Sequence, residues 1–424
     1  MPSRKTILIL HLAGQIPLAG VLWQALHYLV GLRDLGHDVY YAEESGAPPY
    51  DPRVRSNVAD PTYNVACLQQ TLTRFGFADH WGYWDQGEDR HYGLSRDQLR
   101  GLHERADVTV NLCGAMPPPA ATQRRGLWIY IETDPVFEQI RAAQGEPLTL
   151  EFLSRHDACF TYAENLGASD CPIPLGGIAW QKTRPPVVLG LWKERADTAC
   201  RHFSTVATWH NKGKDIAFQG QTYYWSKHVN FLKFLDLPRR TPQSLELAVE
   251  TTDEQVRAEL ATRGWRLADA AEPSATVEGY RDYIYASRGE FTVAKDMYVR
   301  PRTGWFSDRS VCYLAAGKPV VTQETAFSKF IPTGNGLFAF STLDEAVSAL
   351  AAINGDYLHH AHAAREIAAD YFAADKVLRK LLRPWPGRRV RFVRRAPTMV
   401  DRAKLRASYW DGRPRRTNSR RASG

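Results

Sequence analysis

The sequence lacks several patterns that would each point to a particular class of protein. Its six cysteines form no CxxC pair and show no His/Cys ligand spacing, which argues against a structural zinc site or a disulfide framework and favours reduced thiols. The sequence contains no DxD-type carboxylate pair of the kind that would indicate a metal site. The apolar run at residues 6–10 is too short for a signal peptide or a membrane span. We therefore expect a cytoplasmic protein with no metal and no integral membrane segment.

Basic charge is concentrated at one end of the chain. Residues 383–424 hold 14 Lys and Arg against 2 Asp and Glu, a net charge of +12, so the formal charge of +8 leaves the rest of the chain at −4. Residues 384–424 also have few groups that could bury a core, and we expect them to form a disordered basic tail. The tail either contacts an anionic membrane surface or nucleic acid, which would make the protein peripheral to the membrane, or is a solvated extension.

Two series of alternating strands and helices predict an α/β fold. The first opens with the apolar run at residues 6–10, a loop containing glycine, an amphipathic helix at residues 21–35 and a further strand, which together form a βαβ unit. The second opens at residues 203–208. A chain of 424 residues is also too long for one ordinary core. We therefore expect two Rossmann-like doubly wound parallel-sheet domains with a C-terminal helical segment.

A change in composition marks the boundary between the two predicted domains. The stretch IPLGGIAWQKTRPPVVLGLW contains much proline and glycine and few strong helix formers, which is typical of a linker. The predicted units are an N-terminal domain at residues 1–180, a linker at 181–195, a C-terminal domain at 196–370, a closing helix at 371–383 and the basic tail at 384–424.

Several short motifs resemble one family of enzymes. They are ETDP at residues 132–135, HDACFTYAENLG at 156–167, KTRPPVVL at 182–189 and GWFSDRSVCYLAAGKPV at 304–320. Together they resemble bacterial glycosyltransferases of the GT-B fold, in a poorly characterised group with the motif GWFSDRSxxYLAxGxPV. The resemblance covers nearly the whole chain except its tail. It implies transfer of a hexosyl-type sugar from a nucleotide-diphosphate sugar to an unknown small-molecule, polysaccharide or protein acceptor, in a cleft between an N-terminal acceptor domain and a C-terminal donor domain.

The sequence departs from a pattern that many retaining enzymes of this fold share. Those enzymes carry two glutamates eight residues apart before the AxGxPV run, and this chain has Gly304 and Cys312 at the two places. Neither side chain can act as a carboxylate. Glu290 and Glu324 are the nearest acids that could substitute, so the sequence leaves open whether the anomeric configuration is retained or inverted.

A loop of charged and aromatic residues before a predicted helix at 307–316 is the main candidate for donor binding. Ser307 is placed to cap the helix and Asp308 to lie in its first turn, where free backbone amides can hold a phosphate. Cations would neutralise the diphosphate, and an aromatic ring would stack on the base or sugar. The alternative is a capped surface helix after a solvated loop. The predicted donor-binding residues are Lys212, Lys214, Glu290, Lys295, Trp305, Ser307, Asp308, Arg309 and Glu324.

The N-terminal domain supplies the predicted catalytic residues and a glycine loop. Glu132 and Asp134 follow a strand and fit a general base that faces the cleft, although ETDP is also an ordinary turn. The loop with Gly14, Gln15 and Gly20 lacks a full GxGxxG pattern, so no dinucleotide cofactor is expected. By the resemblance this loop faces the cleft; the alternative is that it only turns a strand into a helix.

Two other functions are compatible with these observations. A nucleotide-sugar epimerase would share the fold but would need no acceptor groove, and the aromatic loop at residues 77–93 favours an acceptor surface. A non-catalytic protein that binds a nucleotide-sugar, or a polyanion through its basic tail, belongs to a different class. Truncation at Pro384 separates the enzyme from the tail-driven binder, because an enzyme keeps its activity without the tail.

Overall fold

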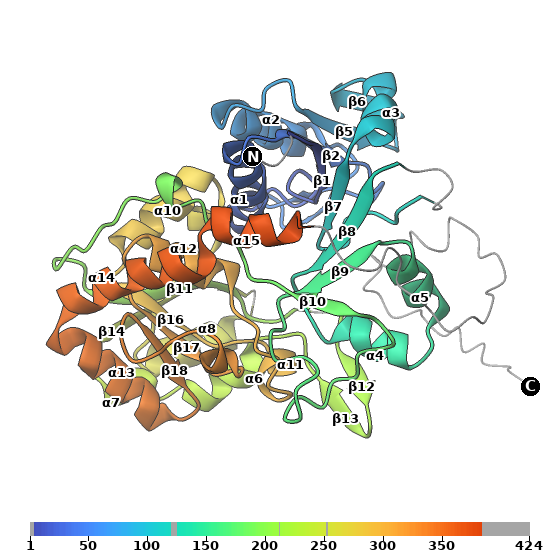
Figure 1. The fold of residues 1–424 in the computed structure, drawn as a ribbon. Helices are drawn as coiled ribbons and strands as arrows, with labels where there is room; N and C mark the ends of the chain where they lie inside the picture. Colours follow the sequence, from blue (N-terminus) through green and yellow to red (C-terminus); the bar gives the residue numbers. More distant parts are fainter. Residues whose placement is uncertain (1–3, 120–124, 212, 252, 384–424) are drawn as a thin grey trace, which may run out of the picture.

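The computed structural model describes residues 4–119, 125–211, 213–251 and 253–383. The predicted basic tail and Lys212 lie outside the described residues. Two sheets dominate the fold, an eight-stranded sheet from the N-terminal half and a six-stranded sheet from the C-terminal half, with helices packed against both (Figure 1). The α/β class and the two predominantly parallel sheets agree with the prediction from the sequence.

The N-terminal sheet has the strand order β10-β9-β8-β7-β1-β2-β5-β6, and its pairings are parallel except that of β5 with β6. Strand β1 lies in the middle, and its segment TILIL is a continuous apolar run because neighbouring elements cover both faces. The strands are β1 (Thr6–Leu10), β2 (Asp38–Glu43), β5 (Trp81–Asp85), β6 (Arg90–Gly93), β7 (Val108–Leu112), β8 (Leu127–Glu132), β9 (Ala158–Thr161) and β10 (Trp180–Lys182). The other elements of this half are α1 (Ala19–Asp34), the pair β3 (Tyr50–Asp51) and β4 (Ser56–Asn57), α2 (Thr62–Arg74), α3 (Arg96–Arg105), α4 (Phe137–Ala143) and α5 (Pro147–Ser154).

The C-terminal sheet is entirely parallel, with the order β15-β14-β11-β16-β17-β18. The chain moves outward from β11 to β14 and β15 and then returns to the other side of β11, so the strand order reverses between β11 and β16. The strands are β11 (His202–Thr208), β14 (Ser244–Glu250), β15 (Arg266–Ala268), β16 (Gly289–Thr292), β17 (Val320–Gln323) and β18 (Leu337–Phe340). The longer helices are α8 (Glu254–Thr262), α10 (Val277–Ala286), α12 (Asp308–Ala315), α13 (Leu343–Gly355), α14 (Tyr357–Ile367) and α15 (Ala374–Leu381). Shorter elements are the hairpin β12 (Ile216–Phe218) and β13 (Gln221–Tyr223), α6 (His228–Phe231), α7 (Leu237–Arg240), α9 (Ala271–Ser274) and α11 (Asp296–Val299).

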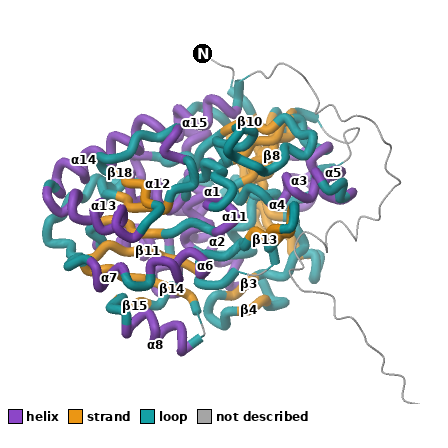
Figure 2. The backbone as a smooth tube through the Cα atoms, turned by 90° about the horizontal axis from the view of Figure 1, so that it is seen from below, coloured by secondary structure: helices purple, strands orange, loops and turns teal. Residues whose placement is uncertain are grey.

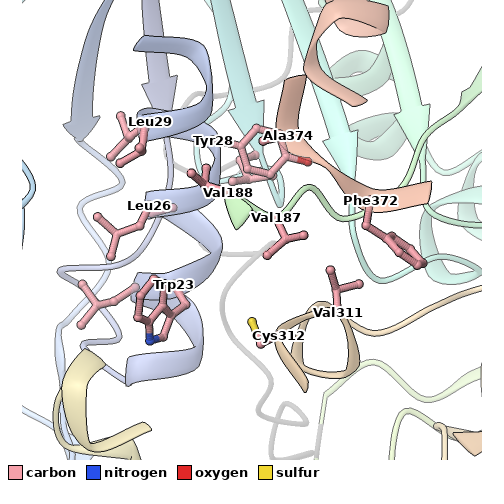
Figure 3. Close-up of a cluster of buried hydrophobic side chains, with 14 of the residues drawn as sticks. Trp23, Leu26, Tyr28, Leu29, Val187, Val188, Val311, Cys312, Phe372 and Ala374 are labelled. Atoms are coloured by element: carbon pink, nitrogen blue, oxygen red, sulfur yellow. The ribbon is translucent and has the colours of Figure 1, made fainter. Parts of the chain in front are cut away.

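Helix α1 joins the two halves of the molecule. It is buried on several sides, because the N-terminal sheet lies on one side and helices of the C-terminal half lie on another. Figure 2 shows α1 and α12 side by side between the two sets of strands. Figure 3 shows Val187 between α1 and α12, with Trp23 on α1 and Val311 and Cys312 on α12. The two sheets are therefore held together by a continuous apolar cluster.

The end of the described chain returns to the N-terminal half. After the π-helical turn Ala368–Phe372, helix α15 packs on α1. Val187 and Ala373 form a parallel bridge at this crossing. A Cβ atom at Gly31 of α1 would lie 2.6 Å from Cδ1 of Leu378, so glycine permits the close approach of the two helices.

Three segments differ from the structure predicted for them. Residues 77–93, expected as a loop, contain the β5–β6 hairpin at the sheet edge. The second series of the sequence also predicts a helix near residues 223–234, and this stretch is instead divided among the end of β13, α6 and a 3₁₀ turn at Leu232–Phe234. Residues 181 and 182, assigned to the linker, belong to β10 and pair with β9. For β5 and β10, pairing with a strand outside the segment contributes to the local structure, since β5 pairs with β2 and β10 pairs with β9.

Candidate active site

A cavity of about 370 Å³ lies between the two sheets. The ends of β11 and β14 and the loops after β15 and β16 form one wall, and the start of α1 and the β3–β4 hairpin form the other. The cavity therefore lies at the carboxyl ends of parallel strands, beside the reversal of strand order between β11 and β16, where open parallel sheets bind their ligands. Its charged and polar lining residues include Gln24, Arg55, Lys227, Glu250, Lys295, Ser307, Asp308 and Arg309.

Arg309 is fixed at the reversal of strand order. Its Nε lies 2.5 Å from Oε1 of Glu290, Nη1 donates to the backbone oxygen of Val206 at 2.7 Å, and Nη2 donates to Oγ1 of Thr292 at 2.8 Å. Burial alone would lower the pKa of Arg309, but Glu290 outweighs burial and the net shift is upward. The guanidinium is therefore charged and held rigidly at the cavity wall. Glu290 is fully buried behind it and does not line the cavity.

Lys227 is a cation of the cavity wall that the sequence analysis did not identify. Its residue is 7% exposed, and its hydrogen-bond partner is Oγ1 of Thr292, at the long distance of 3.4 Å. It forms no ion pair with any described residue. Burial, followed by the charge of Arg309, lowers the pKa of Lys227 well below its ordinary value. An anionic ligand in the cavity would therefore favour the protonated form of Lys227, which burial and Arg309 disfavour.

Lys295 and Asp134 form an ion pair between the two halves of the molecule. Nζ of Lys295 lies 2.6 Å from Oδ1 of Asp134, and the hydroxyl of Tyr298 also donates to this carboxylate. The ammonium of Lys295 lies 4.2 Å from the ring centre of Trp225, and that of Lys214 lies 5.5 Å from it. Burial alone would raise the pKa of Asp134, but Lys295 and Lys214 outweigh burial and hold it below its ordinary value. Asp134 is thus an ionised partner of cations, and Lys295 but not Asp134 lines the cavity.

The start of helix α12 points a hydroxyl and a carboxyl group into the cavity. Ser307 occupies the N-cap position, but its side chain makes no capping hydrogen bond. Asp308 follows at the first helical position, and burial raises its pKa to about 6, with a hydrogen bond from Gln24 acting in the opposite direction. The hydroxyl of Tyr162 lies 3.4 Å from Oδ1 of Asp308. Neither Asp308 nor Glu250, the two acids that line the cavity, forms an ion pair with a described residue.

The N-terminal wall is backed by a neutral hydrogen-bonded cluster. Nε2 of His11 lies 2.9 Å from Oε1 of Gln24, and Sγ of Cys113 lies 3.2 Å from the same oxygen and 3.1 Å from Oγ1 of Thr133. Burial lowers the pKa of His11 to about 4 and raises that of Cys113 to about 12, so both are uncharged near neutral pH. Trp305 completes this wall by donating from Nε1 to the backbone oxygen of Thr133 at 2.8 Å.

Of the two positions of the absent glutamate pair, Gly304 could not hold a glutamate in this fold, whereas Cys312 is buried and lines the cavity. Gly304 has φ +79°, and a Cβ atom there would lie 2.6 Å from the backbone nitrogen of Asn165. Only glycine fits that backbone and that contact. Cys312 is buried in the apolar cluster, with Sγ 3.8 Å from Nε2 of His27. At Gly304 the departure from the retaining pattern therefore has a structural basis.

Two of the predicted acids lie away from the cavity. Glu132 is 1% exposed and accepts from Nε2 of Gln139 at 2.5 Å and from Oγ1 of Thr161 at 2.6 Å, and burial raises its pKa well above the ordinary value. Glu324 accepts a hydrogen bond from the backbone nitrogen of Ala326 in the turn after β17. Neither side chain lines the cavity. Both carboxyl groups stabilise local backbone or side-chain structure.

The glycine loop is held from behind by a buried carboxyl group. Glu43, at the end of β2, accepts hydrogen bonds from the backbone nitrogens of Gly14 and Gln15. A Cβ atom at Gly14 would lie 2.9 Å from Oε1 of Glu43, so glycine is needed at this contact. Gly20 lines the cavity at the start of α1, whereas Gly14 and Gln15 lie behind it.

The β3–β4 hairpin crosses from the N-terminal half to the C-terminal wall. The hydroxyl of Tyr50 lies 3.4 Å from Oε1 of Glu250, and Nη2 of Arg55 lies 2.8 Å from Oδ2 of Asp269. Tyr50 and Arg55 both line the cavity. The sequence offered no signal for this contact, since the hairpin has only two residues in each strand.

Two further searches concern the described residues alone. Among them, no group of three or more His, Cys, Asp and Glu side chains is arranged to hold a metal ion. No helix in the same part of the chain has the length and apolar character needed to cross a bilayer.

Comparisons with known proteins place the architecture. No protein-family profile and no curated protein matches the sequence. Among solved structures, AviGT4, a glycosyltransferase involved in avilamycin A biosynthesis, is 14% identical, with 89% of this chain and 96% of that chain covered and a TM-score of 0.50. HepE of Anabaena in complex with UDP-glucose is 13% identical, with 89% and 98% covered and a TM-score of 0.53. An alpha-glucosyltransferase in complex with UDP and a 13-mer DNA containing an HMU base is 11% identical, with 89% and 98% covered and a TM-score of 0.51.

At sequence identities this low, the structural likeness establishes the fold of this chain but not its activity. The likeness extends over 89% of the chain in all three comparisons, so it includes both sheets. The chain has the two-domain GT-B fold.

Proposed function

We propose that the protein is a glycosyltransferase that moves a sugar from a nucleotide-diphosphate sugar to an acceptor hydroxyl in the cavity between the sheets. The observation that carries this proposal is Lys227, a buried lysine that has no ion pair among the described residues and lines a cavity at the reversal of strand order. The likeness to HepE, which is in complex with UDP-glucose, supports the same ligand class. By the same likeness, the transferred sugar would be of hexosyl type.

The diphosphate would bind where cations and hydrogen-bond donors converge. Lys227 and Arg309 would supply positive charge, and the hydroxyl of Ser307 and backbone amides at the start of α12 would supply donors. Because amides and fixed cations can neutralise a diphosphate, the proposal requires no metal ion. The nucleoside would extend toward α9 and the β3–β4 hairpin, which form the remaining walls of the cavity.

Asp308 would act as the general base that accepts the proton of the attacking acceptor hydroxyl. It faces the N-terminal wall, and its raised pKa of about 6 makes it more basic than an ordinary aspartate while leaving it mostly ionised at neutral pH. As the diphosphate leaves, Lys227 and Arg309 would stabilise its developing charge. Asp134 would fix Lys295 at the cavity wall, which is a positioning role in place of the base role predicted from the sequence. We also propose a structural role for Glu132, since it does not reach the cavity.

A panel experiment tests the ligand class and the reaction. Thermal shifts of the full chain with UDP, GDP, dTDP, ADP and CMP should identify one stabilising nucleotide. The matching nucleotide-sugar, incubated with the protein and a mixture of hydroxylated acceptors and followed by chromatography, should then release the nucleotide and yield a glycosylated acceptor. An epimerized nucleotide-sugar without release would instead support the epimerase, and binding without turnover under any acceptor mixture would support a non-catalytic binding protein. Stabilisation by none of the nucleotides would contradict the proposal.

A further inference from the structure

A second cavity, of about 550 Å³, lies on the N-terminal domain and shares no lining residue with the first. Trp128 of β8 forms part of its lining, and α3 and the residue after α5 contribute His103 and Arg155. The described residues that connect β7 to β8, at 113–119 and 125–126, contain no helix. A crossover helix usually covers the sheet face between parallel strands. Within these described residues, no helix covers this part of the sheet.

Some buried polar groups of this cavity have no hydrogen-bond partner among the described residues. Trp128 is 1% exposed, and its Nε1 has no acceptor among the described residues. Both ring nitrogens of His91 are buried and are likewise without a described partner. Both residues line the cavity. Because an unsatisfied buried donor costs free energy, their arrangement indicates a ligand or ordered water that supplies the missing hydrogen bonds.

An aromatic platform stands beside these donors. The rings of Trp84 and His91 are stacked, with centres 5.6 Å apart and planes at 3° to each other. Nε1 of Trp84 donates to Oδ1 of Asp89 at 3.0 Å, which fixes the indole on the β5–β6 hairpin. This is the segment whose aromatic residues indicated an acceptor surface in the sequence. An aromatic face with hydrogen-bond donors around it suits a ligand with apolar faces and polar edges.

The cations around the cavity are already paired. Arg96 lies 3.7 Å from Asp89, Arg100 lies 2.8 Å from Asp97, and Arg155 is paired with Glu151. His103 lies 2.6 Å from the carboxylate of Glu44. These pairs leave little uncompensated positive charge for a phosphate or a carboxylate. A neutral hydroxylated ring therefore fits the cavity better than a nucleotide does.

The opposite wall of the second cavity is held by hydrogen bonds, and its loop also reaches the cluster behind the first cavity. The side chain of Asn111 holds Met116 by two hydrogen bonds, and Nη1 of Arg155 donates to the backbone oxygen of Pro118 at 3.0 Å. The same loop begins at Cys113, in the cluster behind the first cavity. The loop from Cys113 to Pro118 therefore connects the two regions within a few residues.

We infer that the second cavity binds a pyranose ring of a neutral saccharide, and that this ring belongs to the acceptor. The assignment of the ring to the acceptor rests on the proposed function, whereas the saccharide site itself does not. Trp84 would stack on the apolar face of the ring, and Nε1 of Trp128 would donate to a ring oxygen or hydroxyl. A second ring-binding site outside the cleft would favour an oligosaccharide or polysaccharide acceptor over a small molecule.

Saturation-transfer NMR on the full chain tests the site. The probes are maltohexaose, cellohexaose, xylohexaose and chitohexaose, with AMP as the aromatic alternative. At least one saccharide should bind, and Trp84→Ala should weaken it about tenfold because the platform is lost. Trp128→Phe keeps a buried ring but removes the N–H donor, and it should weaken binding by a smaller factor. Lys227→Met, in the other cavity, is the matched control and should leave saccharide binding unchanged.

Three results would overturn the inference: binding of no saccharide in the panel, preference for AMP, or saccharide binding that survives Trp84→Ala. Circular dichroism of each variant shows whether it is folded, and Trp84→Ala keeps the test valid if Trp128→Phe does not fold, since Trp84 is only partly buried. The nucleotide panel in the same samples separates the two proposals. Nucleotide binding without saccharide binding would contradict this inference alone. Saccharide binding without nucleotide binding would contradict the proposed function alone.

Discussion

The two walls of the central cavity carry opposite kinds of chemistry. The C-terminal wall presents three cations, Lys227, Lys295 and Arg309. The N-terminal wall presents Gln24, which is backed by a cluster that is uncharged near neutral pH, and its one cation, Arg55, is paired with Asp269. Basic side chains therefore lie mainly on the C-terminal wall of the cavity, and neutral hydrogen-bonding groups lie mainly on the N-terminal wall. A charged donor and a hydroxyl-bearing acceptor would use these walls respectively.

The three cations also differ among themselves. Arg309 is paired with the fully buried Glu290, and Lys295 is paired with Asp134 across the domain boundary. Lys227 has no carboxylate partner among the described residues. These two ion pairs form a rigid frame for the cavity wall. Because Lys227 lacks such a pair, a bound anion would change its electrostatic free energy more than that of Arg309 or Lys295. The predictions below test this division between frame and ligand-binding group.

Removing the frame cation should have the largest effect on stability. Arg309→Met leaves Glu290 buried without a partner, so the free energy of unfolding should fall by about 3–5 kcal/mol in urea titrations. The double variant Arg309→Met with Glu290→Leu removes both charges and should recover most of that stability without recovering nucleotide binding. A loss below about 1 kcal/mol in the single variant would contradict the frame role.

Removing the proposed base should act on the rate more than on stability. Asp308→Asn should lower turnover of the nucleotide-sugar by about 100-fold, because general-base catalysis typically contributes that much. In the native enzyme the rate should rise with pH through about 6, the pKa of Asp308, and this limb should disappear in the variant. A limb near pH 6 that persists in Asp308→Asn would assign the titration to another group.

The same pKa shift fixes the sign of a stability effect. Because the folded state raises the pKa of Asp308 to about 6 from an unfolded value of about 3.9, ionisation opposes folding. This contribution should make the native protein lose stability as pH rises from about 4 to about 6, with no further loss above that window. Asp308→Asn should lack the loss, which urea midpoints of the two proteins across this range would show.

Removing the unpaired lysine should stabilise the free protein. The folded state lowers the pKa of Lys227, so below the unfolded pKa protonation of this side chain favours the unfolded state. Lys227→Met should therefore be more stable than the native protein at pH 7, by about 1 kcal/mol or more, and the difference should vanish as pH approaches about 10.4, the unfolded pKa. Urea midpoints at pH 7, 9 and 10.5 measure it. If Lys227→Met were less stable than the native protein at pH 7, Lys227 would have a stabilising structural role like that of Arg309.

Breaking the contact of the hairpin should have a small effect on stability. Arg55 and Asp269 form a partly exposed pair, with side chains 40% and 54% exposed, so Arg55→Ala should change the free energy of unfolding by less than about 1 kcal/mol. Because Arg55 lines the cavity, the variant should release a bound nucleotide a few times faster in stopped-flow experiments. The surface variant Arg240→Ala, which removes a similar exposed pair with Asp344, is the control and should leave nucleotide release unchanged.

Truncation after Arg383 should have the smallest effect on the reaction. The described part of the chain already contains both walls of the cavity, so the shortened protein should keep the nucleotide affinity and turnover of the full chain within a factor of about two. Vesicle or nucleic-acid pull-down of both forms measures the separate role proposed for the tail. A loss of turnover on truncation would contradict the enzyme proposal in its present form.

The sequence predicted what local pattern determines. The run TILIL predicted the central strand, and the predicted residues Trp305, Ser307 and Arg309 line the cavity because the loop before α12 and the first turn of α12 lie close together in the chain. Such features need only a short window of sequence. The fold class followed from the alternation of these windows along the chain.

Features that depend on distant pairing were missed. Lys227 comes from a stretch with no regular pattern, and only the fold brings it to the cavity beside Thr292. Glu132 satisfied every local condition for a cleft residue but is turned into the interior by Gln139 and Thr161. Asp134 was correctly expected near a strand end, yet its partner Lys295 lies 161 positions away in the chain. Local sequence carries no information about such partners.

The most direct test of the central claim is calorimetric titration of Lys227→Met with the nucleoside diphosphate that stabilises the native protein. Lys376→Met, at an exposed ion pair with Asp370, is the matched control. The account predicts that Lys227→Met weakens binding by about tenfold to 100-fold, the range expected when a charge-assisted contact to phosphate is lost, while Lys376→Met leaves it unchanged. Equal affinity of the two variants would contradict the claim that the cavity binds a diphosphate through its unpaired lysine.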